Sequence, residues 1–174
     1  MHTAPAGHST VSLRRPRPAD GAAVHALVAA CPPLDTNSLY CNLLQCTHFA
    51  ATSALAEADG AVRAFVSGYR LPEDPDCLFI WQVAVSAQAR GQGLGKRLML
   101  EILRRPEHRG LHFLRTTITR DNKASWAMFD SLAQALGAPT RREVLFDAER
   151  HFRSRHESEH QLTIGPFDAD QIPD

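Results

Sequence analysis

The stretch whose residues are best suited to do chemistry is a glycine-rich turn. Three glycines alternate between Arg90 and Lys96, directly after an apolar run that ends at Val85. Glycine lacks a Cβ, so such a turn can curl and aim successive backbone N–H groups at one point. Apolar residues then recur every fourth position from Leu94 to Ile102, which predicts a helix whose N-terminus adds unpaired donors and partial positive charge. The segment therefore predicts a cradle for a phosphate or pyrophosphate group.

Two other phosphate-binding motifs fail when they are compared residue by residue. A Walker loop needs a glycine where Arg90 stands and a Ser or Thr where Arg97 stands. A dinucleotide fingerprint needs its last glycine where Lys96 stands. A structural alternative stays open, in which the glycines only let the strand and helix pack closely.

The pattern that does fit is Arg-x-x-Gly-x-Gly, formed by Arg90, Gly93 and Gly95 between a strand and a helix. This arrangement resembles the acetyl-CoA signature of the GNAT acetyltransferase superfamily. The likeness extends to a second segment, in which Asn122 opens a helix, a small residue (Ser125) follows three later and an aromatic (Phe129) seven later. The element order matches as well, so the resemblance spans nearly the whole chain.

The resemblance implies that acetyl-CoA is the co-substrate and that the chain forms a homodimer. Gly91 to Gly95 would bind the pyrophosphate, and the backbone N–H of Val83 would stabilise the oxyanion of the tetrahedral intermediate. The residues that the resemblance assigns to the coenzyme are Val83, Val85, Arg90, Gly91, Gln92, Gly93, Leu94, Gly95, Lys96, Asn122 and Phe129.

One position departs from the family pattern. Many members carry a tyrosine that protonates the leaving thiolate, whereas this chain has Phe129, whose ring has no proton to donate. Either another group supplies the proton or the coenzyme thiolate leaves unaided. The second option is chemically reasonable because a thiol pKa is only about 8.5.

The acceptor side has a more specific likeness. The run Leu34-Asp35-Thr36-Asn37-Ser38-Leu39-Tyr40, together with Ile80-Trp81-Gln82-Val83, resembles the L-2,4-diaminobutyrate acetyltransferases of ectoine synthesis. That resemblance implies transfer of acetyl to the 4-amino group, giving N4-acetyl-L-2,4-diaminobutyrate. Asp35 is then the anchor for an ammonium group, Tyr40 a hydrogen-bond partner and Trp81 a wall. Structural alternatives stay open: a helix-capping role for Asp35, and core positions for Tyr40 and Trp81.

A general base is also needed. An amine with a lysine-like pKa of about 10.4 is the free base in roughly one molecule in 2,500 at pH 7, which adds about 4.6 kcal/mol to the barrier. Glu159 is the first candidate and Asp35 the second. Glu159 and His160 are predicted to contact substrate, with Glu157 and His156 as fallbacks. Alternatively, the His-rich run is a solvated loop.

Composition limits the remaining classes of function. Nineteen Lys and Arg balance nineteen Asp and Glu, so neither nucleic acid nor a membrane surface is an expected partner. The four cysteines and nine histidines show no zinc spacing, so no metal is expected. Reduced thiols and the absence of a visible signal peptide favour a cytoplasmic location.

The elements that must position these residues follow from periodicity and turn signals. Strands are expected at 11–15, 50–57, 61–70, 77–85, 112–118, 142–146 and 161–164, and helices at 19–30, 39–46, 94–104 and 122–136. The sequence thus predicts an α/β fold: one GNAT-like domain over 11–166 with a mixed central sheet of six or seven strands and about four helices. Residues 1–10 are expected to be a flexible tail and 167–174 a C-terminal tail.

Two rival functions remain. One keeps the chemistry and changes the acceptor to another small amine, an amino acid or a peptide. The other, which Phe129 leaves open, is a non-catalytic sensor that binds acyl-CoA.

Overall fold

One seven-stranded sheet organises the part of the chain that the computed structural model describes, residues 10–172. The strands lie in the order β1-β2-β3-β4-β5-β7-β6, and all neighbours are antiparallel except β4 and β5, which are parallel. Their bounds are Ser12–Arg14 (β1), Ala54–Ala58 (β2), Ala61–Leu71 (β3), Asp74–Val85 (β4), Phe113–Thr119 (β5), Thr140–Phe146 (β6) and Glu159–Ile164 (β7). The predicted mixed sheet is confirmed.

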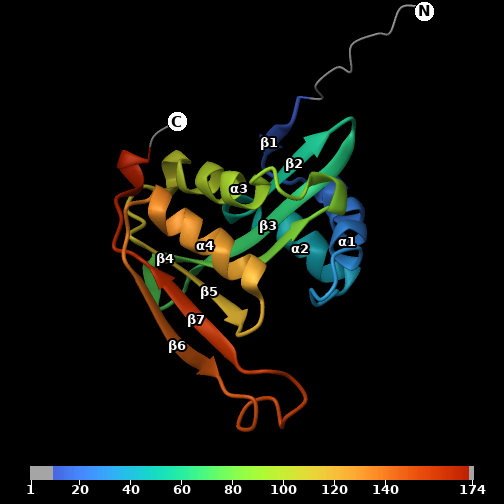
Figure 1. Cartoon of the computed structure of the whole chain (residues 1–174). Helices are drawn as coiled ribbons and strands as arrows, with labels where there is room; N and C mark the ends of the chain where they lie inside the picture. The colour runs from blue at the N-terminus through green and yellow to red at the C-terminus, as the bar shows by residue number, and fades with distance from the viewer. Residues whose placement is uncertain (1–9, 173–174) are drawn as a thin grey trace, which may run out of the picture.

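Four α-helices cover this sheet. They are α1 (Gly21–Ala29), α2 (Leu39–Thr47), α3 (Leu94–Leu103) and α4 (Lys123–Ala135). Helices α3 and α4 lie on one face, α1 and α2 lie on the other, and the β6–β7 hairpin extends away from the body (Figure 1). The expectation of a single α/β domain with about four helices is confirmed.

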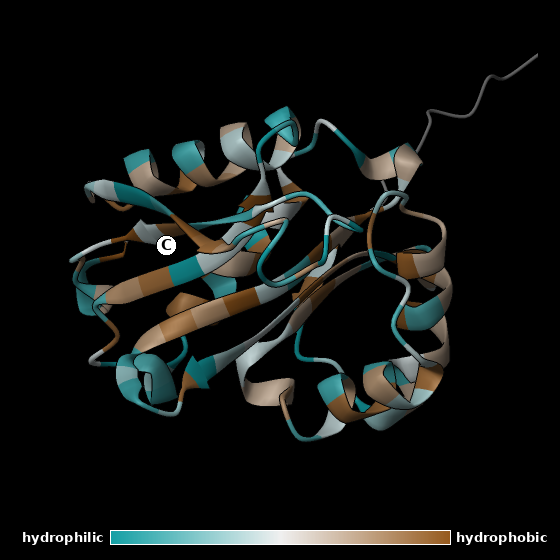
Figure 2. Cartoon of the chain, turned by 90° about the horizontal axis from the view of Figure 1, so that it is seen from below, coloured by the Kyte–Doolittle hydropathy of each residue, from teal (hydrophilic) through white to brown (hydrophobic). Residues whose placement is uncertain are grey.

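Two apolar cores result, one on each face. The larger lies under α3 and α4 and contains Leu98, Ile102, Phe129 and Leu132, all at most 2% exposed. The smaller lies under α1 and contains residues such as Val24, Phe65 and Ala84. Figure 2 shows the apolar strands between the two helical layers. Burying each large apolar side chain contributes roughly 1.5–3 kcal/mol, so both layers are held firmly to the sheet.

Several boundaries differ from the sequence expectations. Residues Ala50–Thr52 form a 3-10 turn and not the start of a strand, because the Thr52 hydroxyl bonds the carbonyls of Phe49 (3.1 Å) and Gly68 (2.6 Å). Strand β4 begins at Asp74 and not at 77 as expected, since only a two-residue turn at 72–73 separates it from β3. Strands β2 and β3 form a hairpin whose turn is Asp59-Gly60, and both residues have positive φ.

The C-terminal segment packs further than the sequence indicated. Phe167 and Ala169, which were assigned to a tail, are each 7% exposed and belong to the larger core. The Phe167 N–H donates to the carbonyl of His112 at 2.9 Å, which ties the segment to the start of β5. The packed chain therefore continues past residue 166. Of the two expected tails, residues 1–9 and 173–174 lie outside the described residues.

The four cysteines are unpaired thiols. Burial raises the pKa of both Cys46 and Cys77 to about 11, so these two thiols are unreactive near neutral pH. No helix in the described range 10–172 is long and apolar enough to cross a bilayer.

A β-bulge interrupts the pairing of β3 and β4 beside the region of chemical interest. Ser67 pairs with Gln82 and Gly68 pairs with Ile80, which leaves Trp81 as the extra residue. A Cβ at Gly68 would lie 2.6 Å from the Phe79 carbonyl oxygen and 3.3 Å from that of Thr52. Because both neighbours are backbone atoms, the bulge requires glycine at this position.

We expect Gly68→Ala to lower the free energy of unfolding by about 2 kcal/mol, since neither carbonyl can move without disturbing the sheet. Gly95→Ala is the matched comparison, because there the nearest atom is the Met128 sulfur at 2.5 Å, on a side chain that can rotate away. Urea unfolding of both variants measures the difference. Equal decreases in the free energy of unfolding would show that the close backbone contacts at Gly68 do not determine the cost of a side chain there.

Candidate active site

The site is built around a fork between β4 and β5. The two parallel strands pair from Cys77 and Phe113 to Ile80 and Thr116, and then separate. At the last pair the Thr116 hydroxyl donates to the Ile80 carbonyl at 3.0 Å. Beyond this point β4 continues to Val85, while β5 continues beside β7. The fork therefore leaves backbone groups of β4 without a strand partner in the middle of the sheet.

The orientation of those groups can be read from the end of β4. The N–H of Ser86 donates to the Arg63 carbonyl on β3 at 2.8 Å, so Ser86 faces β3. Backbone groups alternate along a strand, so Val85 faces the fork, and its carbonyl indeed accepts from the Cys31 thiol at 3.3 Å. Val83, two residues earlier, faces the fork as well. The backbone N–H predicted to stabilise an oxyanion is thus directed into the opening.

A first cavity of about 660 Å³ lies over the glycine turn. Its lining includes Val83, Val85, Arg90, Gly91, Gly93, Leu94, Gly95, Lys96 and Asn122. Gly91 and Gly93 have φ of 79° and 67°, values that side chains other than glycine rarely adopt. The turn therefore has the backbone shape that an anion cradle needs. We name this space the glycine-turn cavity.

Close packing of the strand and the helix, the alternative explanation for the glycines, accounts for one of the three. Gly95 lies inside α3, where an added Cβ would approach the Met128 sulfur and come within 3.1 Å of Val83 Cγ1. Gly91 and Gly93 have nothing within 4 Å of such a Cβ, so only their φ values explain them. The turn thus combines both roles: two glycines shape it and the third allows α3 to approach α4 and β4.

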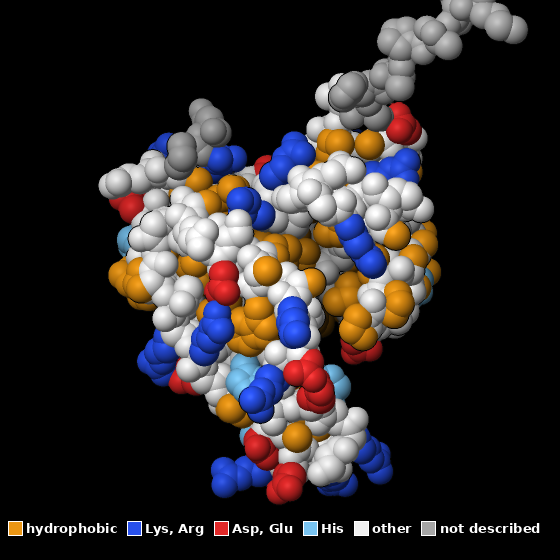
Figure 3. All heavy atoms as spheres, in the orientation of Figure 1, with side chains coloured by type: hydrophobic (Ala, Val, Ile, Leu, Met, Phe, Trp, Pro, Cys, Tyr) orange, Lys and Arg blue, Asp and Glu red, His pale blue; other side chains and the backbone are white. Residues whose placement is uncertain are grey.

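A second cavity of about 760 Å³ lies on the other side of the fork. We name it the acceptor cavity. Its lining comprises Pro33, Leu34, Asp35, Thr36, Asn37, Ile80, Trp81, Gln82, Val83, Thr116, Thr117, Ile118, Thr119, Asn122, Ser125, Phe129, His156, Glu157 and Glu159. The space-filling view shows a hollow with apolar side chains in it, between the part that carries α3 and α4 and the part that carries α1 (Figure 3).

The two cavities meet. Five residues line both of them: Pro33, Leu34, Val83, Asn122 and Ser125. Asn122 caps α4, its side chain accepting from the Ser125 N–H at 3.1 Å, so these two polar residues are held at the junction. A molecule in one cavity can therefore be reached by a molecule in the other beside Val83.

The charges of the two cavities are opposite. The ionisable residues of the glycine-turn cavity, thiols aside, are Arg90 and Lys96, and its described lining has no carboxylate. The acceptor cavity has three carboxylates, Asp35, Glu157 and Glu159, and its described lining has no Lys or Arg. One cavity therefore suits an anion and the other a cation. No group of three or more His, Cys, Asp and Glu side chains in residues 10–172 is arranged to hold a metal ion.

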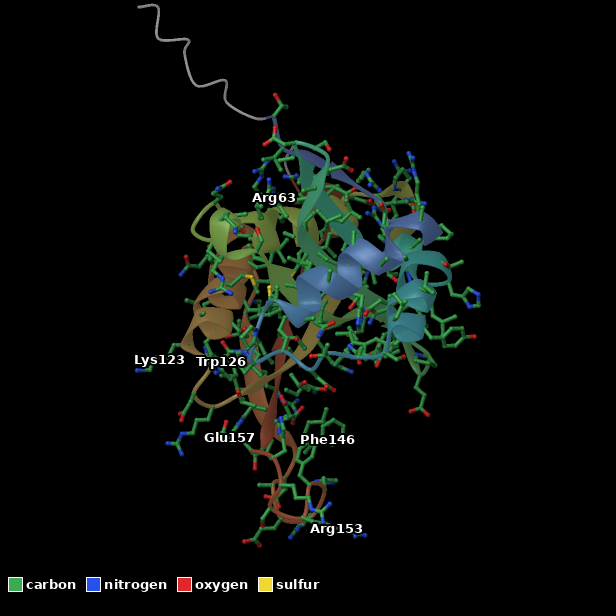
Figure 4. All side chains as sticks on the ribbon, turned by 90° about the vertical axis from the view of Figure 1, so that its right-hand side faces the viewer. Arg63, Lys123, Trp126, Phe146, Arg153 and Glu157 are labelled. Carbon is green, nitrogen blue, oxygen red and sulfur yellow. The ribbon has the colours of Figure 1, made fainter. Side chains whose placement is uncertain are left out.

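The structure brings together most of the predicted acceptor residues. Asp35, Trp81 and Glu159 line the acceptor cavity, as do the fallback residues His156 and Glu157. Glu157 lies between the start of α4, marked by Lys123 and Trp126, and the hairpin tip at Arg153, while Phe146 lies on the hairpin itself (Figure 4). The helix-capping alternative for Asp35 does not apply, because Ser38 caps α2 by accepting from the Cys41 N–H at 3.1 Å. The His-rich run thus contributes directly to the cavity.

Four predicted residues lie elsewhere. Tyr40 is 69% exposed on α2 and does not line the acceptor cavity, because the loop before α2 and not the helix itself faces the fork. His160 is also absent from the lining, since alternation along β7 turns it to the opposite face from Glu159. Gln92 bonds the Gln88 carbonyl at 3.4 Å and is outside the glycine-turn cavity. Phe129 lines the acceptor cavity and not the coenzyme side to which it was assigned.

Sequence reasoning missed several lining residues. The end of β5, where this strand leaves β4, places Thr116, Thr117 and Thr119 in the acceptor cavity. Asn37 and Gln82 were quoted only as part of a family-like run. A buried glutamine between Trp81 and Val83 is the signal that could have singled out Gln82, because a 6% exposed amide must have hydrogen-bond partners.

Comparison with known proteins identifies the class. The family model described as "Acetyltransferase (GNAT) family" matches residues 22–133. The ribosomal-protein-S18-alanine N-acetyltransferase of Escherichia coli superposes with a TM-score of 0.67 at 16% identity, over 95% of this chain and 99% of that one, which shows the shared fold. The chain belongs to the GNAT acetyltransferase family.

More similar relatives narrow the class. The L-2,4-diaminobutyric acid acetyltransferase of Methylotuvimicrobium alcaliphilum is 49% identical, covering 92% of this chain and 94% of the relative. That of Halomonas elongata is 44% identical, covering 95% and 88%. Diaminobutyrate acetyltransferase EctA from Paenibacillus lautus, solved with L-2,4-diaminobutyric acid and coenzyme A, superposes with a TM-score of 0.87 at 35% identity, covering 91% and 96%. The likeness to diaminobutyrate acetyltransferases thus extends over nearly the whole chain.

We expect Lys96→Met to raise the Kd for coenzyme A about tenfold, because a charged donor is removed from the glycine-turn cavity. Arg97→Met removes the same charge one residue along, from an exposed position outside the cavity, and should change the Kd less than twofold. Lys96 Nζ also donates to Ser131 Oγ at 3.0 Å, which joins α3 to α4, so Ser131→Ala separates that structural contact from the charge. Calorimetric titration measures all three variants. Equal increases in Kd for Lys96→Met and Arg97→Met would show that only the overall positive charge matters and not the position of Lys96.

Proposed function

We propose that the chain transfers the acetyl group of acetyl-CoA to the 4-amino group of L-2,4-diaminobutyrate, giving N4-acetyl-L-2,4-diaminobutyrate for ectoine biosynthesis. The observation that carries the proposal is the meeting of a cationic and an acidic cavity at the unpaired backbone of Val83. The relatives at 44–49% identity bear this activity in their names, and the Paenibacillus structure contains both the amino acid and coenzyme A.

In this arrangement the pyrophosphate lies on the glycine turn with Arg90 and Lys96, and the thioester reaches the junction of the cavities. The 4-ammonium group first gives a proton to a base, its freed lone pair then attacks the thioester carbon, and the Val83 N–H donates to the oxygen as it becomes negative. The carbon–sulfur bond then breaks, coenzyme A leaves as a thiolate, and the nitrogen loses its extra proton to a base. Holding both reactants at one junction converts a bimolecular reaction into an effectively unimolecular one.

Glu159 is the proposed base. It pairs with Thr119 across the sheet, and the Thr119 carbonyl accepts from the N–H of Asn122, which lines both cavities. Its carboxylate is therefore carried by a strand that reaches the junction. The side chain is 19% exposed, and one oxygen lies 4.0 Å from His156 Nε2. Asp35 lies on the loop that leads away from the junction, which suits an anchor for the α-ammonium group better than a base.

The thiolate leaves without a tyrosine. Phe129 is 2% exposed and shapes the acceptor cavity, so its role is to exclude water and not to donate a proton. Ser125 carries a hydroxyl at the junction and can donate a hydrogen bond to the sulfur as charge develops on it. Such a bond stabilises the thiolate, and full proton transfer is unnecessary because the thiol pKa is only about 8.5.

We also propose that the chain acts in the cytosol as a homodimer. Unpaired thiols support the location. For association, the support is strand β6, the edge of the sheet, whose seven residues are all exposed. Three of them are large apolar side chains: Val144 at 53%, Leu145 at 37% and Phe146 at 42%. An exposed apolar edge strand is a surface that a second copy would cover.

Coenzyme A release, followed with a thiol reagent, tests the reaction. We expect turnover with acetyl-CoA and L-2,4-diaminobutyrate, much weaker turnover with ornithine, lysine, spermidine and a peptide, and N4-acetyl-L-2,4-diaminobutyrate as the product by NMR. Turnover of another amine at a higher kcat/KM would identify a different acceptor. Tight coenzyme binding without release of thiol in the presence of any amine would favour the acyl-CoA sensor.

Glu159→Gln should lower kcat at neutral pH by a factor of about 10² or more, because the amide cannot accept the proton. Raising the pH supplies more free amine and should reduce the defect. Glu157→Gln tests the fallback base, and Glu149→Gln, in the exposed hairpin loop, should leave the rate unchanged. A larger loss at Glu157 than at Glu159 would transfer the role of base to Glu157.

A further inference from the structure

A buried amide holds the loop that carries Asp35. Residues 33–37 have no helix or strand of their own, yet they line the acceptor cavity. Gln82 on β4, 6% exposed, donates through Nε2 to the Asp35 carbonyl at 2.8 Å. Its Oε1 accepts from Asn37 Nδ2 at 3.3 Å. Both ends of one side chain are therefore used on one loop.

These two bonds also determine which way each amide faces. A backbone carbonyl can only accept, so Gln82 must present its NH₂ group to Asp35. Its oxygen is then left for Asn37, which must present its own NH₂ group in return. This chain of hydrogen bonds starts at a carbonyl that can only accept and passes through the two side-chain amides. Turning either amide over would place two acceptors against each other.

The last atom in this order is Asn37 Oδ1. Asn37 lines the acceptor cavity, and its oxygen has no hydrogen bond to any other residue in the range 10–172. An amide oxygen accepts and cannot donate, so it complements an ammonium group. It lies two residues along the same loop from the Asp35 carboxylate, which supplies the opposite charge.

The position along the loop indicates which ammonium group is bound. Pro33 and Leu34 line both cavities, whereas Asp35, Thr36 and Asn37 line the acceptor cavity alone. The loop thus leads from the reaction junction into the acceptor cavity. In diaminobutyrate the 4-amine must reach the junction and lose a proton, while the α-amine stays protonated away from it.

We infer that Gln82 is a positioning residue that fixes the polarity of Asn37, so that Asn37 Oδ1 and Asp35 together bind the α-ammonium group of the acceptor. This inference rests on the proposed function and adds two residues to it. It makes the Gln82–Asn37 pair the part of the site that distinguishes an α,γ-diamino acid from an amine without the α-amino group.

4-Aminobutyrate, which is the proposed substrate without its α-amine, is the probe. The wild-type protein should use diaminobutyrate at a kcat/KM at least 100-fold above that for 4-aminobutyrate. Gln82→Met keeps the volume of the side chain and removes both hydrogen bonds, and should raise the KM for diaminobutyrate about tenfold with kcat changed less than threefold. It should leave 4-aminobutyrate kinetics and the KM for acetyl-CoA nearly unchanged. The ratio of kcat/KM for diaminobutyrate to kcat/KM for 4-aminobutyrate, which we call the substrate ratio, therefore falls.

Two further variants make the result independent of folding. Asn37→Ala, on a half-buried loop, should lower the same ratio without loss of stability. Gln45→Met is the matched control, since Gln45 is 1% exposed and accepts from Asn42 Nδ2 at 2.9 Å in the neighbouring helix α2, away from either cavity. It should lower stability and leave the substrate ratio intact. Retention of the wild-type ratio by Gln82→Met or Asn37→Ala would overturn the inference.

Hydrogen exchange separates this inference from the proposed function. In Gln82→Met the Leu34 amide, whose N–H donates to the Cys31 carbonyl at 3.0 Å, should exchange at least tenfold faster than in the wild type, whereas in Gln45→Met it should not. If the wild type fails to acetylate diaminobutyrate, the proposed function fails, and exchange still reports on the amide pair. Unchanged exchange in Gln82→Met would show that the loop does not depend on Gln82.

Discussion

The constraint on which the site depends is the separation of two parallel strands that begin as neighbours. As far as Ile80 and Thr116, β4 and β5 satisfy each other's hydrogen bonds, and beyond that pair they no longer do. Unsatisfied backbone groups inside a sheet are costly, so the opening is stable only if other groups fill it. Cys31 and Arg90 already donate to the Val85 carbonyl from outside the ladder, and at Val83 we propose that the backbone N–H donates to the thioester oxygen. Both cavities and their junction follow from this one departure from regular pairing.

The bulge at Trp81 and the fork act together. Without the extra residue, alternation would carry Gln82 to the other face of β4, and the loop bearing Asp35 would lose its contact with the strand. Gly68 permits the bulge because it has no side chain to strike the Phe79 carbonyl. A glycine on β3 therefore supports the acceptor cavity without lining it.

The sequence predicted the coenzyme side better than the acceptor side, and there is a physical reason. The glycine turn is local: strand, turn and helix are contiguous, and positive φ at Gly91 and Gly93 follows from residue type. The acceptor cavity is assembled from the 33–37 loop, β4, β5, α4 and the β7 region, so periodicity within one segment cannot report it. Glu159 and Asp35 were predicted by residue type and line the acceptor cavity, whereas Tyr40 and His160 do not line it because the turn of a helix and the pleat of a strand direct them elsewhere. Element boundaries moved where a hydroxyl, as at Thr52, competed with strand pairing.

Strand β7 connects the outer edge of the sheet to its chemistry. Glu159 pairs with Thr119 on one side and with Phe146 on the other, and Phe146 is part of the exposed edge strand. Any surface that covers β6 is thus one residue pair away from the carboxylate that we place beside the reacting amine. The proposed association through β6 and the proposed base on β7 share a structural element here, so the specific activity of this chain is expected to depend on its concentration wherever that association is incomplete.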